Sequence, residues 1–324
     1  MRAVIPVAGV GTRLRPHTYS LPKVLLNVAG KPILAHIMDA IIEQGITKAT
    51  IITGYMRKTV ESFVRQRYNI EVDFVPQKES LGLGHAIWTG QDTYDNEPLM
   101  IILGDTVFDV DLKLAEKSGI SSIGVKKVED PRRFGVVIKN DSGYITKFVE
   151  KPKEFVSDLA IVGLYYISNP QLLMQCLNEV VEKDIQTSGE YQLTDALQLM
   201  LEKGEKFSSF QVEGWFDCGK PETLLSTNRH LLDKQNQFPA PNGSVIIPPV
   251  FIAPDAKIIR SIIGPYATVA DGATVEDSII RDTIISNGAK VCSSLLTESI
   301  IGNNAQVKGN FIKMNVGNSS EINY

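Results

Sequence analysis

The sequence contains few cysteines and no long apolar run. Its three cysteines, Cys176, Cys218 and Cys292, lie far apart without Cys-x-x-Cys spacing. This spacing argues against a zinc site or a disulfide framework and favours a reducing cytoplasm. No stretch approaches the ~18 uninterrupted apolar residues of a membrane span, and Met1-Arg2 is not followed by an apolar signal region. We therefore expect a soluble, cytoplasmic protein that does not bind a membrane.

A strong charge of either sign is also missing. The formal net charge is −4, with 33 Lys and Arg against 37 Asp and Glu, and the cations are dispersed along the chain. This dispersal excludes the basic footprint of a nucleic-acid-binding protein. The 324 residues, 43% of them hydrophobic, are enough for a buried core and about two domains.

The first glycine-bearing turn lacks the common nucleotide-binding signatures. Gly9-Val-Gly11, followed by Thr12 and Arg13, matches neither the P-loop pattern nor Gly-x-Gly-x-x-Gly. Glycines still allow backbone N–H groups to approach phosphate oxygens closely, and Arg13 supplies a guanidinium fork. Lys23 would add a second cation. We interpret the turn as a phosphate cradle; the alternative is a turn that merely ends an edge strand.

Helical and β-strand patterns alternate along the first part of the chain. Apolar spacing predicts a helix over 33–42 and strands over 49–53, 70–75 and 99–103. The alternation predicts an α/β fold with a doubly wound, mostly parallel sheet, whose ligands bind beyond the carboxyl ends of its strands. Gly9 and Asp105 follow such ends. Asp217, at the end of a later predicted strand, is a second carboxylate in such a position.

A second glycine-bearing loop runs from Gln77 to Ala86 and leads into a predicted helix. We interpret it as the wall of a base pocket, because the Gln77 amide offers both a donor and an acceptor to a pyrimidine edge. The alternative is a simple helix entry.

Proline and glycine mark a boundary near residue 240, and the pattern changes beyond it. We predict a first domain over 1–236, a linker over 237–244 and a second domain over 245–324. In the last segment Ala256, Ala273, Ala289 and Ala305 each begin an Ala-x-Val/Ile unit, at intervals of 17, 16 and 16 residues. Short strands in this phase are typical of a left-handed parallel β-helix with hexapeptide repeats; a β-sandwich is the alternative. Because the segment has no cluster of His, Cys or acidic residues, we expect it to mediate homo-oligomer contacts.

An ordered set of motifs over residues 1 to about 236 resembles the sugar-1-phosphate nucleotidylyltransferases, which have a Rossmann-like fold, and the repeat segment resembles the β-helix appended to several of them. Each motif alone is weak, whereas the ordered set is specific. The motifs are Gly9-Val-Gly-Thr-Arg-Leu14, Pro22-Lys23, Gly82-Leu-Gly-His-Ala86, Gly104-Asp105, Phe134-Gly-Val-Val137, Glu150-Lys-Pro152, Ala160-Ile-Val-Gly163, Gly189-Glu190 with Thr194-Asp195, and Asp217 before Gly219.

The resemblance implies that a sugar 1-phosphate oxygen attacks the α-phosphorus of a nucleoside triphosphate and expels pyrophosphate. It assigns catalysis to Arg13, Lys23, Asp105 and Asp217, with Mg²⁺ held by Asp105 and Asp217. Phosphoryl-type transfer needs positioning and charge neutralisation, and these residues match that need. The implied nucleotide-binding residues are Val7, Ala8, Gly9, Gly11, Thr12, Arg13, Lys23, Gln77, Gly82 and Asp105. The implied sugar-phosphate-binding residues are Gly135, Glu150, Lys151, Val162 and Glu190.

The sequence leaves alternatives open for the nucleotide that is used and for whether the protein is an enzyme. The short cradle Ala8-Gly-Val-Gly-Thr-Arg13 resembles that of bacterial uridylyltransferases making UDP-glucose, whereas Gly104-Asp105 resembles the thymidylyltransferase pattern. We expect UTP and glucose 1-phosphate as substrates, with dTTP as the alternative nucleotide. A non-catalytic regulatory subunit that binds nucleotide sugars is the alternative of a different class. The complete set of metal-binding and cationic residues favours an enzyme.

Overall fold

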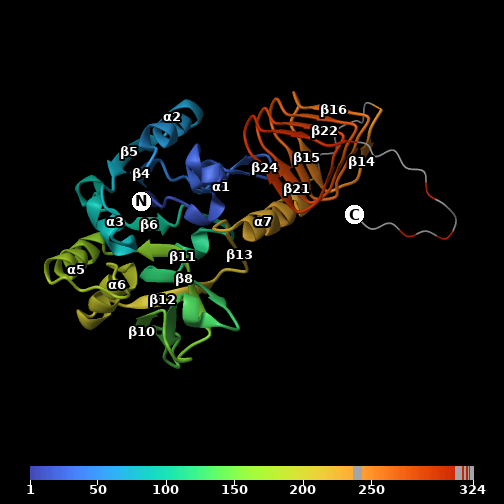
Figure 1. The fold of residues 1–324 in the computed structure, drawn as a ribbon. Helices are drawn as coiled ribbons and strands as arrows, with labels where there is room; N and C mark the ends of the chain where they lie inside the picture. Colours follow the sequence, from blue (N-terminus) through green and yellow to red (C-terminus); the bar gives the residue numbers. More distant parts are fainter. Residues whose placement is uncertain (236–242, 311–315, 317–318, 320, 322–324) are drawn as a thin grey trace. The chain divides into compact units, whose positions relative to one another are not determined.

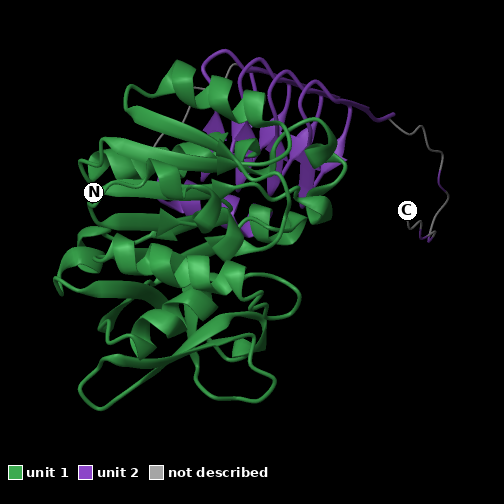
Figure 2. Cartoon of the chain, turned by 90° about the vertical axis from the view of Figure 1, so that its left-hand side faces the viewer, with its two compact units in different colours: residues 1–26, 31–224 green, residues 27–30, 225–324 purple. Residues whose placement is uncertain are grey.

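The computed structural model describes residues 1–235, 243–310, 316, 319 and 321. The chain divides into two compact units, residues 1–26 with 31–224 and residues 27–30 with 225–324 (Figure 2). This division falls within α7 (Pro221–Asp233), whereas the sequence suggested a boundary after residue 236. Most of the predicted linker, 237–244, lies outside the described residues, and the predicted domain limits remain predictions. No helix in the described part of the chain is both long and apolar enough to span a membrane.

The first unit is built on a mixed sheet in which nine strands are described, in the order β5-β4-β1-β6-β11-β8-β12-β10-β9. β5, β4, β1 and β6 run parallel, as the alternating pattern predicted, and β11 is antiparallel to both β6 and β8. Antiparallel strands therefore make up much of the second half of the sheet. The α/β fold class is confirmed. The strands are β1 (Arg2–Val7), β4 (Lys48–Thr53), β5 (Glu71–Pro76), β6 (Leu99–Ile102), β8 (Ser121–Lys127), β9 (Gly135–Lys139), β10 (Ile145–Glu150), β11 (Leu159–Ile167) and β12 (Phe207–Gln211).

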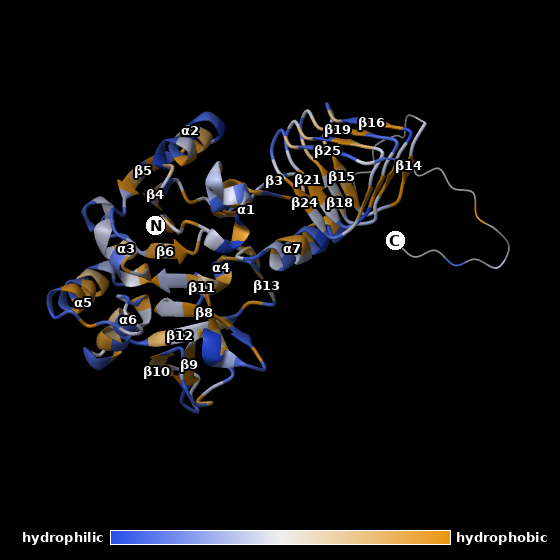
Figure 3. Cartoon of the chain, viewed as in Figure 1, coloured by the Kyte–Doolittle hydropathy of each residue, from blue (hydrophilic) through white to orange (hydrophobic). Residues whose placement is uncertain are grey.

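Helices with one apolar face pack on this sheet. In α5 (Pro170–Glu182), Asn169 caps the first turn by accepting a hydrogen bond from the Leu172 amide at 3.1 Å. Leu173 and Leu177, spaced by four residues on one face, are fully buried in the core. Figure 3 shows the contrast between the hydrophobic strand β6 and the largely hydrophilic helix α2. The other helices are α1 (Ile33–Glu43), α2 (Arg57–Arg67), α3 (Leu83–Thr89), α4 (Lys113–Glu116) and α6 (Leu193–Glu202).

Two short ribbons complete the strands that precede the repeat. β7 (Thr106–Asp109) pairs antiparallel with β13 (Gly214–Asp217), and in this register Asp217 lies opposite Thr106. The other short strands are β2 (Asn27–Val28) and β3 (Lys31–Pro32). The β7–β13 ribbon matters for the site because it joins segments that are far apart in the sequence.

The second unit contains a parallel β-helix (Figure 1). Its described strands form three sheets of four strands each, and every neighbouring pair is parallel. Ile258, Val275, Val291 and Val307 lie in register on successive coils, so the Ala-x-Val/Ile repeat of the sequence corresponds to one turn of the helix. The predicted β-helix is confirmed. The sheets are β14 (Val245–Ile246), β17 (Ile262–Ile263), β20 (Ile279–Ile280) and β23 (Leu295–Leu296); β15 (Val250–Ile252), β18 (Ala267–Val269), β21 (Thr283–Ile285) and β24 (Ser299–Ile301); and β16 (Lys257–Ile259), β19 (Thr274–Glu276), β22 (Lys290–Cys292) and β25 (Gln306–Lys308).

Candidate active site

A cavity of about 400 Å³ opens where the parallel strands β1, β5 and β6 end. Its volume lies within the range of small-molecule sites. Each residue that the sequence assigned to nucleotide binding lies in its wall. These residues are Val7, Ala8, Gly9, Gly11, Thr12, Arg13, Lys23, Gln77, Gly82 and Asp105.

The phosphate cradle is a tight turn held by its own hydrogen bonds. Gly11 has φ +69°, and a Cβ there would lie 3.0 Å from the Lys23 Cβ, so both the backbone conformation and the space favour glycine. The Thr18 hydroxyl donates to the Gly11 carbonyl at 2.8 Å, and the Leu14 amide donates to the same carbonyl at 3.0 Å. A Cβ at Gly9, in contrast, would meet nothing within 4 Å. Packing therefore does not demand a glycine at position 9, but the open space beside it suits a close-fitting ligand.

The two predicted metal ligands come together through the β7–β13 ribbon. Asp217 pairs with Thr106, the neighbour of Asp105, and the Cys218 amide donates to the Asp105 carbonyl at 2.9 Å. Gly219 leaves room for the Asp217 carboxylate, because a Cβ there would lie 2.8 Å from Asp217 Oδ1. Two strand ends distant in the sequence thus place their carboxylates in one region.

Electrostatic interactions link these carboxylates to the predicted cations. Lys23 is buried, and its Nζ donates to Asp105 Oδ2 at 2.7 Å. Burial, and then the charge of Asp105, raise the pKa of Asp217, while Lys23 and Arg13 oppose this rise. Arg13, Lys23 and Asp105 line the cavity, and all three charges act on Asp217, which is not among the described lining residues.

The carboxylate pair has the donor chemistry that Mg²⁺ prefers, but it is an incomplete cage. No cluster of three or more His, Cys, Asp or Glu residues able to hold a metal occurs in the described part of the chain. A hard cation at Asp105 and Asp217 would therefore need phosphate oxygens and water to complete its shell. This donor set fits a metal that arrives with the nucleotide.

The predicted sugar-phosphate residues do not all line the cavity. Of the five, Glu190 is the one found among the residues described as lining the cavity. Glu150 Oε2 accepts a hydrogen bond from the Thr194 hydroxyl at 2.8 Å, and the Lys151 ammonium lies 3.7 Å from Glu150 Oε1. A Cβ at Gly135 would lie 2.8 Å from Glu150 Oε2, so Gly135, Glu150 and Lys151 form one group. Burial raises the pKa of Glu150, and the hydrogen bond from Thr194 and the charge of Lys151 oppose this rise.

The fifth predicted residue, Val162, is buried in β11. The neighbouring Asp195 lies in the first turn of α6, where its Oδ1 accepts from the Thr187 hydroxyl at 3.1 Å. Asp195 thus occupies a position at which helices commonly carry an acidic residue.

Several cavity residues were not assigned from the sequence. Gly219 and Ala86 were quoted in motifs without a contact role, and Ser80 lies within the Gln77–Ala86 loop that was interpreted as a pocket wall. Their positions in those motifs were the available signal. Leu103 and Val24 are apolar wall residues, and nothing in their local sequence distinguishes them from core residues.

A glycine turn at the ends of parallel strands, with two carboxylates and two cations nearby, is an arrangement typical of a protein that binds phosphorylated ligands. The family model that matches residues 2–234 is that of the nucleotidyl transferases, and the chain belongs to this family. The family suggested by the motifs is thereby confirmed.

Three known proteins illustrate the similarity. The UTP–glucose-1-phosphate uridylyltransferase AglF of Haloferax volcanii is 32% identical over 246 residues, covering 73% of this chain and 99% of that protein. The glucose-1-phosphate thymidylyltransferase of Streptomyces griseus is 29% identical over 315 residues, covering 88% of this chain and 86% of that protein, so this match extends into the second unit. A crystal structure of UDP-glucose pyrophosphorylase complexed with UDP-glucose matches with a TM-score of 0.64 at 26% identity, over 72% of this chain and 99% of that one.

Proposed function

We propose that the protein transfers a uridylyl group from UTP to glucose 1-phosphate, forming UDP-glucose and pyrophosphate, with dTTP as the alternative nucleotide. The observation that carries the proposal is the grouping at the cavity: Arg13, Lys23 and Asp105 line it, Lys23 binds Asp105, and the β7–β13 pairing places Asp217 opposite Thr106. The similarity to a uridylyltransferase and to a thymidylyltransferase supports a pyrimidine nucleotide and a glucose 1-phosphate acceptor. The short cradle favours UTP.

In the proposed reaction, a phosphate oxygen of the sugar 1-phosphate attacks the α-phosphorus in line. The bond from this phosphorus to the pyrophosphate oxygen breaks, and pyrophosphate leaves with the electron pair. Arg13 neutralises charge on the departing pyrophosphate, and Lys23 orients the α-phosphate from its buried position beside Asp105. Asp105 and Asp217 would hold Mg²⁺, which supplies further charge neutralisation when bound. The chain need supply no nucleophile, because the acceptor phosphate is itself the nucleophile.

The acceptor groups are proposed to lie next to this centre. Glu190 lines the cavity and would accept a hydrogen bond from a sugar hydroxyl, as would Glu150. Lys151 would bind the sugar phosphate, and Gly135 and Val162 would offer backbone groups. The pairing of Lys151 with Glu150 keeps an ammonium group beside a carboxylate, which suits an acceptor carrying both phosphate and hydroxyls.

A pyrophosphate-release panel tests the substrates. It crosses UTP, dTTP, ATP, CTP and GTP with glucose, galactose, mannose and glucosamine 1-phosphates. We expect UTP with glucose 1-phosphate to give the highest kcat/KM and dTTP to follow, because a C5 methyl changes the fit by only ~1–3 kcal/mol. The highest kcat/KM with ATP or GTP would contradict the pyrimidine proposal. Tight nucleotide-sugar binding without turnover would instead favour a regulatory subunit.

We further propose that the protein works in the cytoplasm as a homo-oligomer assembled through its β-helix. Val245, Ile262, Ile279 and Leu295 form an in-register aliphatic row on one β-helix sheet, and Leu295 is 80% exposed. Such a row is suited to burial between copies. No disulfide joins the three cysteines, which is consistent with a reducing compartment.

Light scattering tests the assembly. Leu295→Glu should lower the solution mass, because it places a charge in the middle of a buried apolar contact. Lys257→Glu, an exposed charge change on a different sheet of the β-helix, is the control. An unchanged mass in Leu295→Glu would contradict this interface.

A further inference from the structure

The orientation of the Gln77 side chain is determined by its neighbours. Gln77 is 8% exposed and lines the cavity, and its Nε2 donates to the Gly82 carbonyl at 3.1 Å. A carbonyl oxygen only accepts hydrogen bonds, so the amide group facing Gly82 must be the NH₂. The same Nε2 lies 3.1 Å from Nδ1 of His85. Both amide hydrogens of Gln77 are therefore engaged within the protein.

This contact also determines the state of His85. Because the amide nitrogen of Gln77 is the donor, Nδ1 of His85 must carry a lone pair, and the ring proton lies on Nε2. A protonated ring would instead point an N–H at the amide nitrogen. Burial lowers the pKa of His85, and the carboxylate of Glu79 opposes this effect. The neutral ring is thus the form that fits its surroundings.

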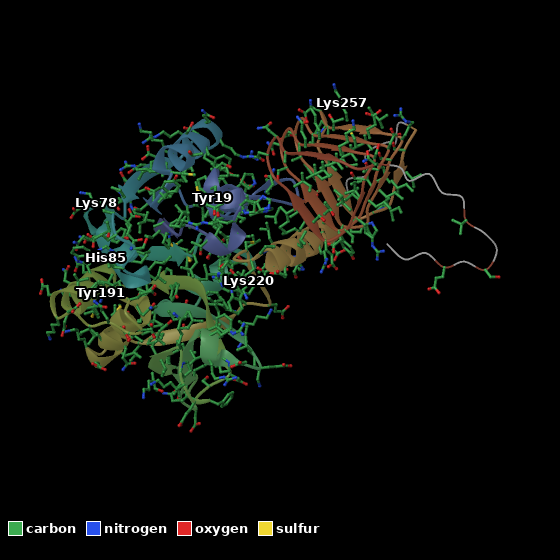
Figure 4. The ribbon with its side chains drawn as sticks, in the orientation of Figure 1. Tyr19, Lys78, His85, Tyr191, Lys220 and Lys257 are labelled. Carbon is green, nitrogen blue, oxygen red and sulfur yellow. The ribbon has the colours of Figure 1, made fainter. Side chains whose placement is uncertain are left out.

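Aromatic packing holds the His85 ring in place. The ring stacks on Trp88 with centroids 5.6 Å apart and an interplanar angle of 30°. It also contacts Tyr191, whose ring centroid lies 6.2 Å away (Figure 4). Trp88 is anchored in turn, since its Nε1 donates to Asn178 Oδ1 at 2.7 Å. His85 therefore presents its acceptor to Gln77 from a fixed position, although it is not among the described cavity-lining residues.

Gln77 consequently offers a ligand only an acceptor. No hydrogen bond among the described residues uses its Oε1, so this oxygen is the polar atom of the side chain that remains for a base. Uracil and thymine carry a hydrogen on N3 and can donate to it. Cytosine has a lone pair on N3, so a cytosine seated in the same position would place two acceptors against each other and leave a buried polar group unsatisfied. Its 4-amino donor lies at another ring position and would reach Oε1 only if the base shifted.

We propose that His85 is a positioning residue for base selection, which locks the Gln77 amide so that the site takes 2,4-dioxopyrimidine nucleotides and rejects cytosine nucleotides. This inference rests on the proposed transfer from a pyrimidine nucleoside triphosphate. It adds a residue outside the cavity wall that decides which pyrimidine is used, and it predicts that uracil and thymine are read through the same hydrogen bond.

The test compares kcat/KM for UTP and CTP in the full-length protein and three variants. His85→Phe keeps an aromatic ring beside Trp88 but removes the acceptor, so Gln77 retains only its contact with Gly82. We expect the UTP-to-CTP ratio to fall about tenfold, through the KM values and not through kcat, as befits the loss of one anchoring hydrogen bond. His85→Asn places an Oδ1 acceptor near the position of Nδ1 and should keep the ratio within about threefold. Trp88→Phe keeps both an aromatic ring beside His85 and the acceptor itself, and should also leave the ratio nearly unchanged.

The outcomes separate this inference from the proposed function. If the wild type selects UTP over CTP and His85→Phe keeps the same UTP-to-CTP ratio, the role of His85 is overturned but the proposed function is not. Equal losses of kcat with both nucleotides would show a merely structural residue and would also overturn it. If His85→Phe fails to fold, a tenfold loss of the ratio in folded His85→Asn contradicts the inference, and a retained ratio supports it. A wild-type protein that uses neither UTP nor dTTP would instead refute the proposed function.

Discussion

Replacing Asp217 by Asn should make the protein more stable and far less active. The pKa of Asp217 is raised in the folded chain, by burial and by the nearby charge of Asp105. A raised pKa means that the ionised carboxylate opposes folding at neutral pH, and that this penalty is lost as the pH falls through the folded-state value. Asn has nearly the same size and no charge. Without nucleotide or Mg²⁺, the Asp217→Asn variant should therefore unfold at a higher temperature than the wild type at pH 7.

The magnitude of the activity loss follows from the position of the carboxylate. Since Asp105 and Asp217 are the two proposed protein donors, replacing one by Asn removes a unit of negative charge from the shell of the proposed ion. A loss of about 3–4 kcal/mol of transition-state stabilisation corresponds to ~10² to 10³-fold in rate. Asp105→Asn should lose a similar factor, and the double variant should lose less than the product of the two, because both residues serve one ion.

Three measurements decide this prediction. Calorimetry compares the unfolding temperatures, and the advantage of Asp217→Asn should shrink as the pH falls through the raised pKa of Asp217. Steady-state turnover at saturating Mg²⁺ gives the activity, and circular dichroism checks the fold. Asp141→Asn removes an exposed carboxylate in the turn before β10 and should change neither quantity. Near-wild-type turnover in Asp217→Asn would refute the metal assignment, and a lower unfolding temperature would refute the electrostatic reasoning.

Three further predictions address the same site and the β-helical unit. Lys23→Met removes the buried ammonium that donates to Asp105, and kcat/KM should fall by about 10²-fold; an effect below threefold would contradict its role. The wild-type kcat/KM should decline at acid pH as Asp217 becomes protonated. A higher Mg²⁺ concentration should move this decline to lower pH, because a cation stabilises the ionised carboxylate. If pH profiles at two Mg²⁺ concentrations decline at the same pH, the prediction is wrong. Asn228 is buried and bonds to the Ala29 amide at 2.8 Å, the Thr268 hydroxyl at 2.7 Å and the Tyr266 carbonyl at 3.2 Å. Asn228→Ala should therefore cost about 2–3 kcal/mol in urea unfolding, with turnover per folded molecule unchanged, and a cost below about 0.5 kcal/mol would be inconsistent with these bonds.

The local chemistry of this protein could be predicted from the sequence. Gly9 and Gly11 followed by Arg13 predict a turn that carries a cation, because this depends on neighbouring residues and not on distant ones. The Ala-x-Val/Ile spacing predicted the register of Ile258 with Val275 on successive coils. Both patterns involve residues close in the chain or repeated at a constant period. For the same reason, the alternation of helices and strands predicted the parallel strands β1, β4, β5 and β6.

The tertiary structure decided what depends on pairing between distant segments. β12 (Phe207–Gln211) was not predicted, because its residues FSSFQ alternate only weakly, yet it lies between β8 and β10 within the sheet. Proximity of Asp217 to Asp105 follows from the β7–β13 register, which no local pattern encodes. The sequence identified Gln77 as an amide with a donor and an acceptor. Only the folded chain, by placing Gly82 and His85 against its nitrogen, determined that the donor is already used and the acceptor remains.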